Sequence, residues 1–313
     1  LNIDEPEIPD EDVPEPDVQI AAAEGGAPLS GHVLLVEDNP VNRQVALRIL
    51  GLLGLSVETA THGREALEKL DATRFDLVLM DCQMPVMDGY TATRARRIHE
   101  HEGRSERVPI VAMTANAMAG DREKCLAAGM DDYLSKPLNR GLLEQTLRKW
   151  LPQDALSRPA PASAAAATYA STQTVATPAA TVTLTENLAP VQPVAQHNGA
   201  ALDQEIVRDL LDVMGEEFAD LVRVYLEDTP KNVVLLEQAA ARRDIAALIA
   251  PSHSLKSTSA NLGAMTLSEI AKRIEHEARA GTLHDPATPV HELAREYGRV
   301  AAELRNLLAK SGA

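Results

Sequence analysis

The sequence predicts two folded domains of different classes: a doubly wound α/β domain with a five-stranded parallel sheet, then an all-α helical bundle. The 313 residues are enough for two ordinary domains with linkers. Residues 31–151 alternate short apolar runs with amphipathic stretches, whereas residues 201–310 show helical periodicity throughout. Between them, residues 152–200 consist largely of Ala, Pro, Thr and Ser, which is typical of a flexible linker.

Continuous apolar runs in the first domain predict parallel strands that are covered on both faces. The runs are Val33–Val36, Leu77–Met80 and Ile110–Met113, with weaker strand signals at Ser56–Thr59, expected near a sheet edge, and at Asp132–Ser135. The helices expected between and after them are Pro40–Leu53, Arg64–Leu70, Gly89–Ile98, Asp121–Ala128 and Leu142–Trp150. Strands and helices in this alternation predict five βα units with right-handed crossovers.

In the second domain, apolar residues recur at spacings of three and four, as expected of packed helices. Thr229-Pro230 fits either a helix start, with Pro at the first helical position, or a proline inside one long helix. Asp244 is a candidate cap for the following helix.

Charge and composition narrow the function classes. The net charge of −16 argues against nucleic acid or an anionic membrane as partner. Residues 1–30 hold nine acidic residues and no Lys or Arg, and we expect a disordered acidic linker there. Two cysteines imply no disulfide framework and fit a reducing cytoplasm. No apolar run reaches the ~18–20 residues that cross a bilayer. We expect a cytoplasmic piece of a longer protein, whose parent could be anchored in the inner membrane.

Chemically distinctive residues follow four of the predicted strands. Glu37 and Asp38 come after the first strand, Asp81 ends the third, Thr114 ends the fourth and Lys136 ends the fifth. Ligands bind such sheets beyond the carboxyl ends of the strands, so these side chains should meet. Three carboxylates call for a cation, and oxygen ligands favour Mg²⁺. Asp81 can then attack phosphorus as a nucleophile while the metal and Lys136 neutralise charge and Thr114 contacts a phosphate oxygen.

Each of these residues alone would be an ordinary cap, turn or strand-end residue. Their coincidence resembles the receiver domain of response regulators, which has a flavodoxin-like fold. The stretches that carry the resemblance are Val33-Leu-Leu-Val-Glu-Asp-Asn-Pro40, Met80-Asp-Cys-Gln-Met-Pro-Val-Met-Asp-Gly89, Met113-Thr-Ala-Asn116 and Tyr133-Leu-Ser-Lys-Pro137.

The resemblance implies a role for each residue of this set. Asp81 is the expected phosphoacceptor, and Asp38 and Asp81 are expected to bind Mg²⁺ directly. The backbone carbonyl of Gln83 joins them, while Glu37 acts mostly through water. Thr114 and Tyr133 are the expected switch pair, and the Lys136–Pro137 bond is expected to be cis. Cys82, for which we expect neither a second thiol nor a His motif nearby, is interpreted as a small neighbour of Asp81.

A second candidate site lies in the helical domain, in Ser252-His-Ser-Leu-Lys-Ser-Thr-Ser-Ala-Asn-Leu-Gly-Ala264. On a helix, His253, Lys256 and Ser257 share one face, whereas Leu255 and Leu262 point toward the bundle. A surface imidazole beside a cation and a small residue suits nucleophilic attack on a phosphoryl group. The spacing alone would more often describe a plain surface histidine.

The stretch around His253 resembles the histidine-containing phosphotransfer (HPt) domain, a four-helix bundle, over residues ~201–310. The resemblance implies that His253 accepts a phosphoryl group with support from Lys256 and Ser257. Two departures stand out. Ser257 occupies a position where Gly is frequent, and Pro251 should kink the helix or start a new segment.

A receiver followed by an HPt module resembles the C-terminal part of a bacterial hybrid sensor histidine kinase. Phosphoryl groups would pass from a kinase histidine to Asp81, then to His253, then to a separate response regulator. A phosphate sink, in which the flow runs backward to Asp81, stays open, as does a docking scaffold for a kinase. The linker would tether His253 near Asp81 at high effective concentration, or would be a plain spacer.

Two further classes are disfavoured by the sequence. A phosphatase of the haloacid dehalogenase type needs a second Asp two residues after its nucleophile, where this chain has Gln83. A DNA-binding output would need a basic helix-turn-helix, which the sequence lacks. The chain also has no glycine-rich nucleotide loop of the kinase type and no Walker motif, so it should not label itself from ATP.

Overall fold

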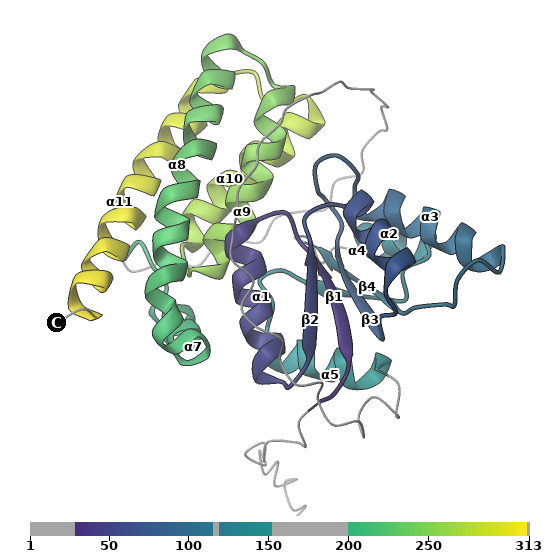
Figure 1. Ribbon diagram of the computed structural model, residues 1–313. Helices are drawn as coiled ribbons and strands as arrows, with labels where there is room; N and C mark the ends of the chain where they lie inside the picture. The colour runs from purple at the N-terminus through teal and green to yellow at the C-terminus, as the bar shows by residue number, and fades with distance from the viewer. Residues whose placement is uncertain (1–28, 115–118, 152–199, 312–313) are drawn as a thin grey trace, which may run out of the picture.

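The structure is a computed structural model that describes residues 29–114, 119–151 and 200–311. The predicted acidic segment and the predicted linker lie outside the described residues, except for their last one or two residues. Within the described ranges, an α/β domain is followed by a helical bundle (Figure 1).

The α/β domain contains one parallel sheet with the strand order β2-β1-β3-β4-β5. Its strands are β1 (His32–Val36), β2 (Ser56–Ala60), β3 (Leu77–Asp81), β4 (Ile110–Thr114) and β5 (Asp132–Ser135). The weak β2 lies at an edge, as predicted, and every neighbouring pair is parallel. The helices are α1 (Pro40–Leu52), α2 (Gly63–Ala72), α3 (Gly89–His101), α4 (Ala119–Ala127) and α5 (Arg140–Trp150).

Successive strand residues point to opposite faces of the sheet, which gives the sheet two cores. Val33 and Leu35 of β1 face a core shared with α1 and α5. Leu34 and Val36 face a second core that includes residues of α2, α3 and α4. The doubly wound fold predicted from the apolar runs is therefore confirmed.

The helical domain is built from α7 (Gln204–Met214), α8 (Phe218–Arg242), α9 (Ile249–Asn261), α10 (Met265–Ala280) and α11 (Ala287–Ser311). Short 3₁₀ turns, Gly215–Glu217 and Ala246–Leu248, precede α8 and α9. Helices α8 to α11 each pack against two neighbours and close a ring, so the predicted four-helix bundle is present, with α7 added before it.

The prolines of the bundle resolve the two open points of the sequence. Pro230 lies inside the long helix α8, so Thr229-Pro230 does not start a helix. Pro251 is the third residue of α9, in the first turn, where a helix has no internal partner for a backbone N–H. It therefore begins a new segment and does not interrupt an existing helix. Asp244 accepts a hydrogen bond from the backbone N–H of Ala247 at 3.1 Å, as a cap.

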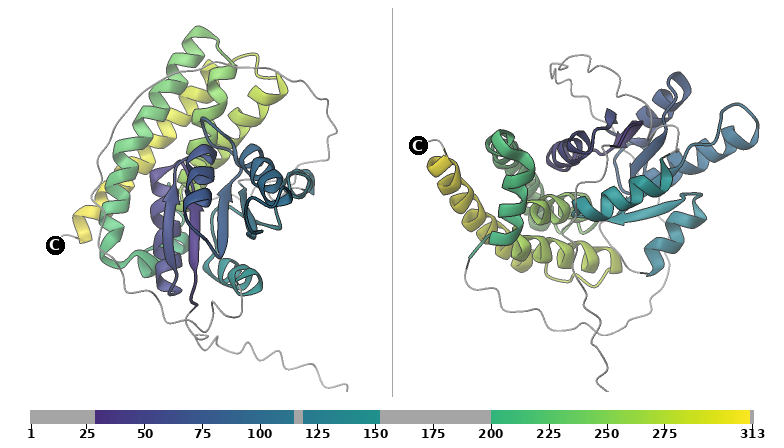
Figure 2. Two further views of the ribbon diagram at one scale, coloured as in Figure 1. Left: turned by 45° about the vertical axis from the view of Figure 1, so that its right-hand side comes forward. Right: turned by 90° about the horizontal axis from the view of Figure 1, so that it is seen from below.

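The two domains are docked through α1. This helix packs on the sheet with one side and against α7, α8 and α9 with the other (Figures 1 and 2). At the far end of α1, the Arg48 Nε atom donates to the carbonyl of Val213 at 2.9 Å. One continuous apolar core extends from the sheet through α1 into the bundle. The start of α1 is thereby held beside α9, which carries His253.

Among the described residues, none of the helices is both long enough and apolar enough to cross a membrane.

Candidate functional site

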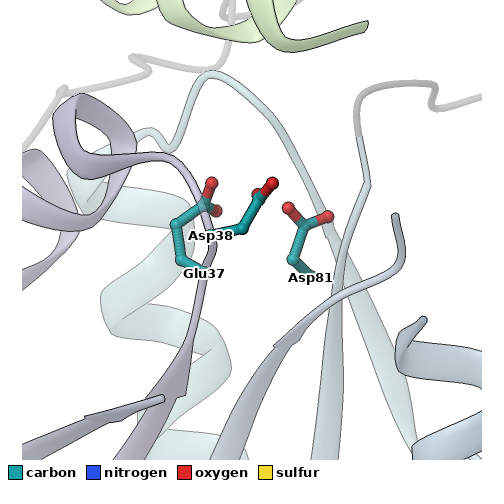
Figure 3. Close-up of side chains that lie close together, drawn as sticks. All are labelled: Glu37, Asp38 and Asp81. Carbon is teal, nitrogen blue, oxygen red and sulfur yellow. The ribbon is translucent and has the colours of Figure 1, made fainter. Parts of the chain in front are cut away.

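Three carboxylates meet beyond the ends of β1 and β3. Carboxylate oxygens of Glu37, Asp38 and Asp81 all lie within 4.8 Å of one another, and the three side chains converge on one space (Figure 3). Because β1 and β3 are adjacent and parallel, their carboxyl ends open at the same edge of the sheet. The sequence prediction that these three residues come together agrees with this geometry.

Lys136 lies among the carboxylates. Its Nζ atom donates to the Glu37 Oε2 atom at 2.6 Å and to the Asp81 Oδ2 atom at 2.7 Å. Burial would lower the pKa of the Lys136 amine, but the charges of Asp81 and Glu37 outweigh burial and hold that pKa above its usual value. The ammonium group is therefore fixed beside the carboxylate of Asp81, where the charge of a transferred group would have to be neutralised.

One ammonium group does not balance three carboxylates, of which Glu37 and Asp81 are buried and Asp38 is partly buried. Burial raises the pKa of the Glu37 carboxyl to about 7. The attraction of Lys136 opposes this rise, and repulsion by Asp81 and Asp38 adds to it. Burial, and then repulsion by Asp81, raises the pKa of the Asp38 carboxyl to about 6. Among the charges that lower the pKa of Asp38 is that of His253, so the histidine of the bundle lies near enough to act on this site. A divalent cation would relieve this repulsion, and the all-oxygen donor set fits Mg²⁺.

Two local features hold the loops of the site. The Arg43 side chain donates to the backbone carbonyls of Glu37 and Asp38, which fixes the loop after β1. After β3, the backbone N–H of Gly89 donates to the carbonyl of Cys82 at 3.2 Å. A Cβ atom at Gly89 would lie 2.1 Å from the carbonyl oxygen of Asp81, so only glycine fits this close approach.

The remaining predicted residues of the α/β domain lie on β4, on β5 and in the loops that follow β3 and β5. Thr114 ends β4 and is buried, whereas Tyr133 in β5 is partly buried and packs on the second core. The Lys136–Pro137 bond is cis, as predicted. The backbone N–H of Gln83 donates to the Asp81 Oδ1 atom at 3.1 Å, and its side-chain oxygen accepts from Arg279 of the bundle at 2.7 Å.

His253 lies on α9, on the side of the bundle that faces the acidic cluster. Next to it, the Ser254 hydroxyl accepts a hydrogen bond from Asn39, which caps the start of α1. The His253 Nδ1 atom lies 2.8 Å from the Glu275 Oε1 atom. Since an ionised carboxylate can only accept a hydrogen bond, Nδ1 carries a proton, and in the neutral imidazole this leaves the lone pair on Nε2.

Glu275 on α10 is the organising group of this second site. Its carboxylate binds Lys256 at 2.6 Å through Oε2, and Arg279 and His253 through Oε1. Burial alone would raise the pKa of the Glu275 carboxyl, but the hydrogen bond and charge of His253, together with Lys256, lower it to about 2. Glu275 is therefore a buried anion that orients the imidazole ring.

Two interpretations from the sequence need correction. The sequence predicts a surface imidazole beside a cation, but the His253 side chain is only 14% exposed. The cation, Lys256, is buried and paired with Glu275. Both groups are covered because α9 packs against α10 and α1. Cys82 does have a second thiol close to it, since its Sγ atom lies 3.7 Å from that of Cys125 on α4.

Sequence reasoning missed Glu275 and Asn42, although each leaves a signal. Glu275 lies on the face of α10 that also holds the buried Ala271 and Ala278, where an acidic residue requires a buried partner. Asn42 lies on the buried face of α1 with Val45 and Ala46. A polar residue on an otherwise apolar helix face indicates a specific hydrogen-bonding partner.

Comparison with known proteins agrees with this division of the chain. Residues 33–148 match the family model of the response regulator receiver domain, and residues 220–309 match that of the Hpt domain. The chain is 32% identical over 286 residues to sensor protein GacS of Pseudomonas syringae pv. syringae, an alignment covering 90% of this chain and 29% of that protein. It is 30% identical to the signal transduction histidine-protein kinase BarA of Shigella flexneri, covering 90% of this chain and 28% of that protein.

Among solved structures, the receiver domain of sensor histidine kinase PA1611 from Pseudomonas aeruginosa PAO1 is 50% identical. The match covers 39% of this chain and 97% of that one, with a TM-score of 0.36, and that crystal structure contains a magnesium ion in the active site cleft.

The fold, the acidic cluster and the family matches define a two-domain signalling protein of the two-component class. The chain contains a response regulator receiver domain and an Hpt domain, arranged as in hybrid sensor histidine kinases, and it spans less than a third of the length of those relatives. This combination of domains supports phosphorelay signalling.

Proposed function

We propose that Asp81 accepts a phosphoryl group from a kinase phosphohistidine and that His253 then takes it from Asp81. The phosphoryl group passes next to an Asp of a separate response regulator. The observation that carries this proposal is the docking of α9 over the acidic cluster, with Ser254 bonded to Asn39 and Arg279 bonded to Gln83 on either side of the site. In this arrangement the imidazole oriented by Glu275 lies close enough to the acidic cluster for its charge to act on Asp38.

In the proposed transfer, the lone pair of the His253 Nε2 atom attacks phosphorus, and the bond between phosphorus and the Asp81 carboxylate oxygen breaks. The imidazole ring, which retains its Nδ1 proton, gains positive charge that the Glu275 carboxylate offsets at 2.8 Å. The Lys136 ammonium stabilises the released Asp81 carboxylate at 2.7 Å. Thr114 and Tyr133 are the proposed switch pair, and Lys256 and Ser257 support the histidine.

We propose Mg²⁺ as the metal of the acidic cluster, with Asp38 and Asp81 as direct ligands, the Gln83 carbonyl as a third ligand and Glu37 acting through water. The convergence of three carboxylates and the raised pKa values of Glu37 and Asp38 support a cation there. When bound, the metal would neutralise oxygens of the transferred phosphoryl group.

The proposed upstream partner is a histidine kinase core, in the same parent protein, and the proposed downstream partner is a receiver of another response regulator. The proposed location is the cytoplasm. The same docked geometry serves backward flow from His253 to Asp81, so a phosphate sink is compatible with it. A phosphatase of the haloacid dehalogenase type finds no support, because the Gln83 side chain cannot act as its acid and is bonded to Arg279.

The test uses the full chain, Mg²⁺ and ³²P-labelled acetyl phosphate as a small-molecule donor. Label on the wild-type chain should move from an alkali-labile acyl phosphate on Asp81 to an acid-labile phosphohistidine on His253. The variant His253→Ala should retain only the acyl phosphate, and Asp81→Asn should label at neither residue. Labelling of His253 in Asp81→Asn, or of the wild-type chain by ATP alone, would contradict the proposal.

A further inference from the structure

Uncharged polar side chains connect the start of α1 with α9. The Asn42 Nδ2 atom donates to the Ser257 hydroxyl at 3.1 Å, and the Asn261 Nδ2 atom donates to the Asn42 Oδ1 atom at 2.7 Å. Close by, the Asn39 Nδ2 atom donates to the Ser254 hydroxyl at 3.0 Å. We call Asn42, Ser257 and Asn261 the amide contact; it crosses from the receiver domain to the bundle beside the acidic cluster.

Asn42 is the centre of the amide contact because it uses both ends of its amide. Its Nδ2 atom also donates to the Glu37 Oε1 atom at 3.0 Å, so the same side chain reaches the acidic cluster and the bundle. Only 4% of Asn42 is exposed in the docked arrangement. Two donated bonds and one accepted bond match the NH₂ group and the carbonyl oxygen of an asparagine amide.

Ser257 fits this role as an acceptor. Its hydroxyl oxygen lies 3.2 Å from the carbonyl oxygen of Ser254 in the preceding turn, to which it can donate its single proton. The lone pairs of Ser257 are then free to accept from Asn42. A glycine at this position, which is frequent in HPt domains, would remove the acceptor that Ser257 offers to the Asn42 Nδ2 atom. The serine therefore adds a bond that depends on the asparagine.

We propose that the amide contact selects the partner receiver of this HPt domain. It favours the receiver of the same chain and, outside the chain, receivers with asparagine at the position of Asn42 in the first turn of α1. This inference rests on the proposed function and adds to it the kind of receiver that the bundle accepts.

Other side chains at that position fail for separate reasons. A leucine would leave the Asn261 amide without its acceptor and the Ser257 hydroxyl without its donor in the docked interface. An aspartate could accept from Asn261 but would lose the donor to Ser257. It would also place a second negative charge beside the Glu37 carboxylate, which the Asn42 Nδ2 atom now contacts at 3.0 Å. Asparagine therefore satisfies all three partners.

The test measures the single-turnover rate at which label moves from Asp81 to His253 in the full chain. We expect Asn42→Leu and Asn261→Leu each to slow this step about ten-fold. The fold-change in rate of the double variant should be much smaller than the product of the two single fold-changes, because both substitutions break the same contact. Asn306→Leu, an exposed asparagine of α11, is the matched control and should transfer at the wild-type rate.

A second arm tests selection directly. The acceptor is the chain carrying Asp81→Asn, and the donor is an outside receiver, labelled on its own Asp, that has leucine at the position of Asn42. Changing that leucine to asparagine should raise transfer to His253 about ten-fold, and this gain should disappear when the acceptor also carries Asn261→Leu.

The outcomes separate the two proposals. If the wild-type chain never transfers label from Asp81 to His253, the proposed function fails. If the wild-type chain transfers label but Asn42→Leu and Asn261→Leu do so at the same rate, the function stands and the amide contact has no selective role. Circular dichroism of each variant checks that it is folded. Because Asn42 lies in the receiver domain and Asn261 in the bundle, a folding defect in one domain cannot explain slow transfer in both variants.

Discussion

At the scale of single residues, the site depends on how buried charges are paired. Glu275 is the clearest case, since its carboxylate contacts His253, Lys256 and Arg279. A buried carboxylate in this position fixes the tautomer of the imidazole and offsets the charge that the ring gains on phosphorylation. The receiver has the opposite arrangement of charges: among the described residues, Lys136 is the one ammonium group that pairs with the carboxylates of Glu37 and Asp81.

We predict that Glu275→Gln slows transfer from Asp81 to His253 about ten-fold, or ~1.4 kcal/mol in the barrier. The amide keeps an acceptor for Nδ1 but loses the negative charge. The measurement is the single-turnover rate. Urea denaturation gives the fraction of each variant that is folded under the assay conditions. Glu269→Gln, on the exposed side of the same helix and paired only with Lys272, is the control. An unchanged rate in folded Glu275→Gln would limit Glu275 to a structural role.

The acidic cluster makes the stability of the folded chain depend on pH. Without metal, the carboxyls of Glu37 and Asp38 have pKa values raised to about 7 and about 6, so the folded chain holds these protons more tightly than the unfolded chain. Their contribution to stability is therefore full below pH ~4 and is lost as pH rises through 6 and 7.

Because the proposed Mg²⁺ ion would compete with those protons, we predict that Mg²⁺ raises the melting temperature more at pH 8 than at pH 5. The measurement is calorimetry of the full chain with MgCl₂ or with KCl of equal ionic strength. Asp38→Ala should lose most of the Mg²⁺ effect at pH 8. Equal shifts at both pH values in the wild-type chain would argue against metal binding by these carboxylates.

At the scale of elements, the turn between β3 and α3 tolerates no side chain at Gly89. A Cβ atom there would meet the Asp81 carbonyl oxygen, and relief would move the backbone that carries Asp81. We predict that Gly89→Ala lowers the free energy of unfolding by ~1–3 kcal/mol and slows labelling of Asp81. In α11, Gly298→Ala meets nothing within 4 Å and should raise stability by up to ~1 kcal/mol. If urea denaturation shows the same change in the free energy of unfolding for Gly89→Ala and Gly298→Ala, the steric argument is wrong.

The elements themselves were predictable from the sequence, but their ends were less so. Strands covered on both faces leave continuous apolar runs, so β1, β3 and β4 were each found within one residue. Helix α3 was predicted to end at Ile98 but continues to His101, because no residue stops it before Gly103, which has a φ of 70°.

The contents of the acidic cluster could also be predicted, since parallel strands bring their carboxyl ends to one edge. The environment of His253 could not. Glu275 lies 22 residues later on another helix, and no spacing rule connects the two. The docking of α1 on the bundle depends on complementary surfaces that lie far apart in the sequence, so only the three-dimensional structure reveals the amide contact.

At the scale of the whole molecule, the docked arrangement must be firm enough for transfer and weak enough to release the bundle to another receiver. Arg48 contributes at the end of α1 remote from the site, where it binds the Val213 carbonyl at 2.9 Å and Glu217 at 3.4 Å. The ion pair is half-exposed and contributes little, whereas the charge-assisted bond to the carbonyl is stronger.

We predict that Arg48→Glu shifts the chain toward an undocked arrangement, because the new carboxylate faces both the carbonyl and Glu217. Small-angle X-ray scattering should show a larger radius of gyration, and transfer from Asp81 to His253 should slow while labelling of Asp81 by acetyl phosphate is retained. Arg74→Glu is the matched control, since Arg74 is exposed and pairs with Glu106 within the receiver domain. If both variants scatter like the wild-type chain, Arg48 does not hold the domains together, and the polar and apolar contacts nearer the start of α1 must suffice.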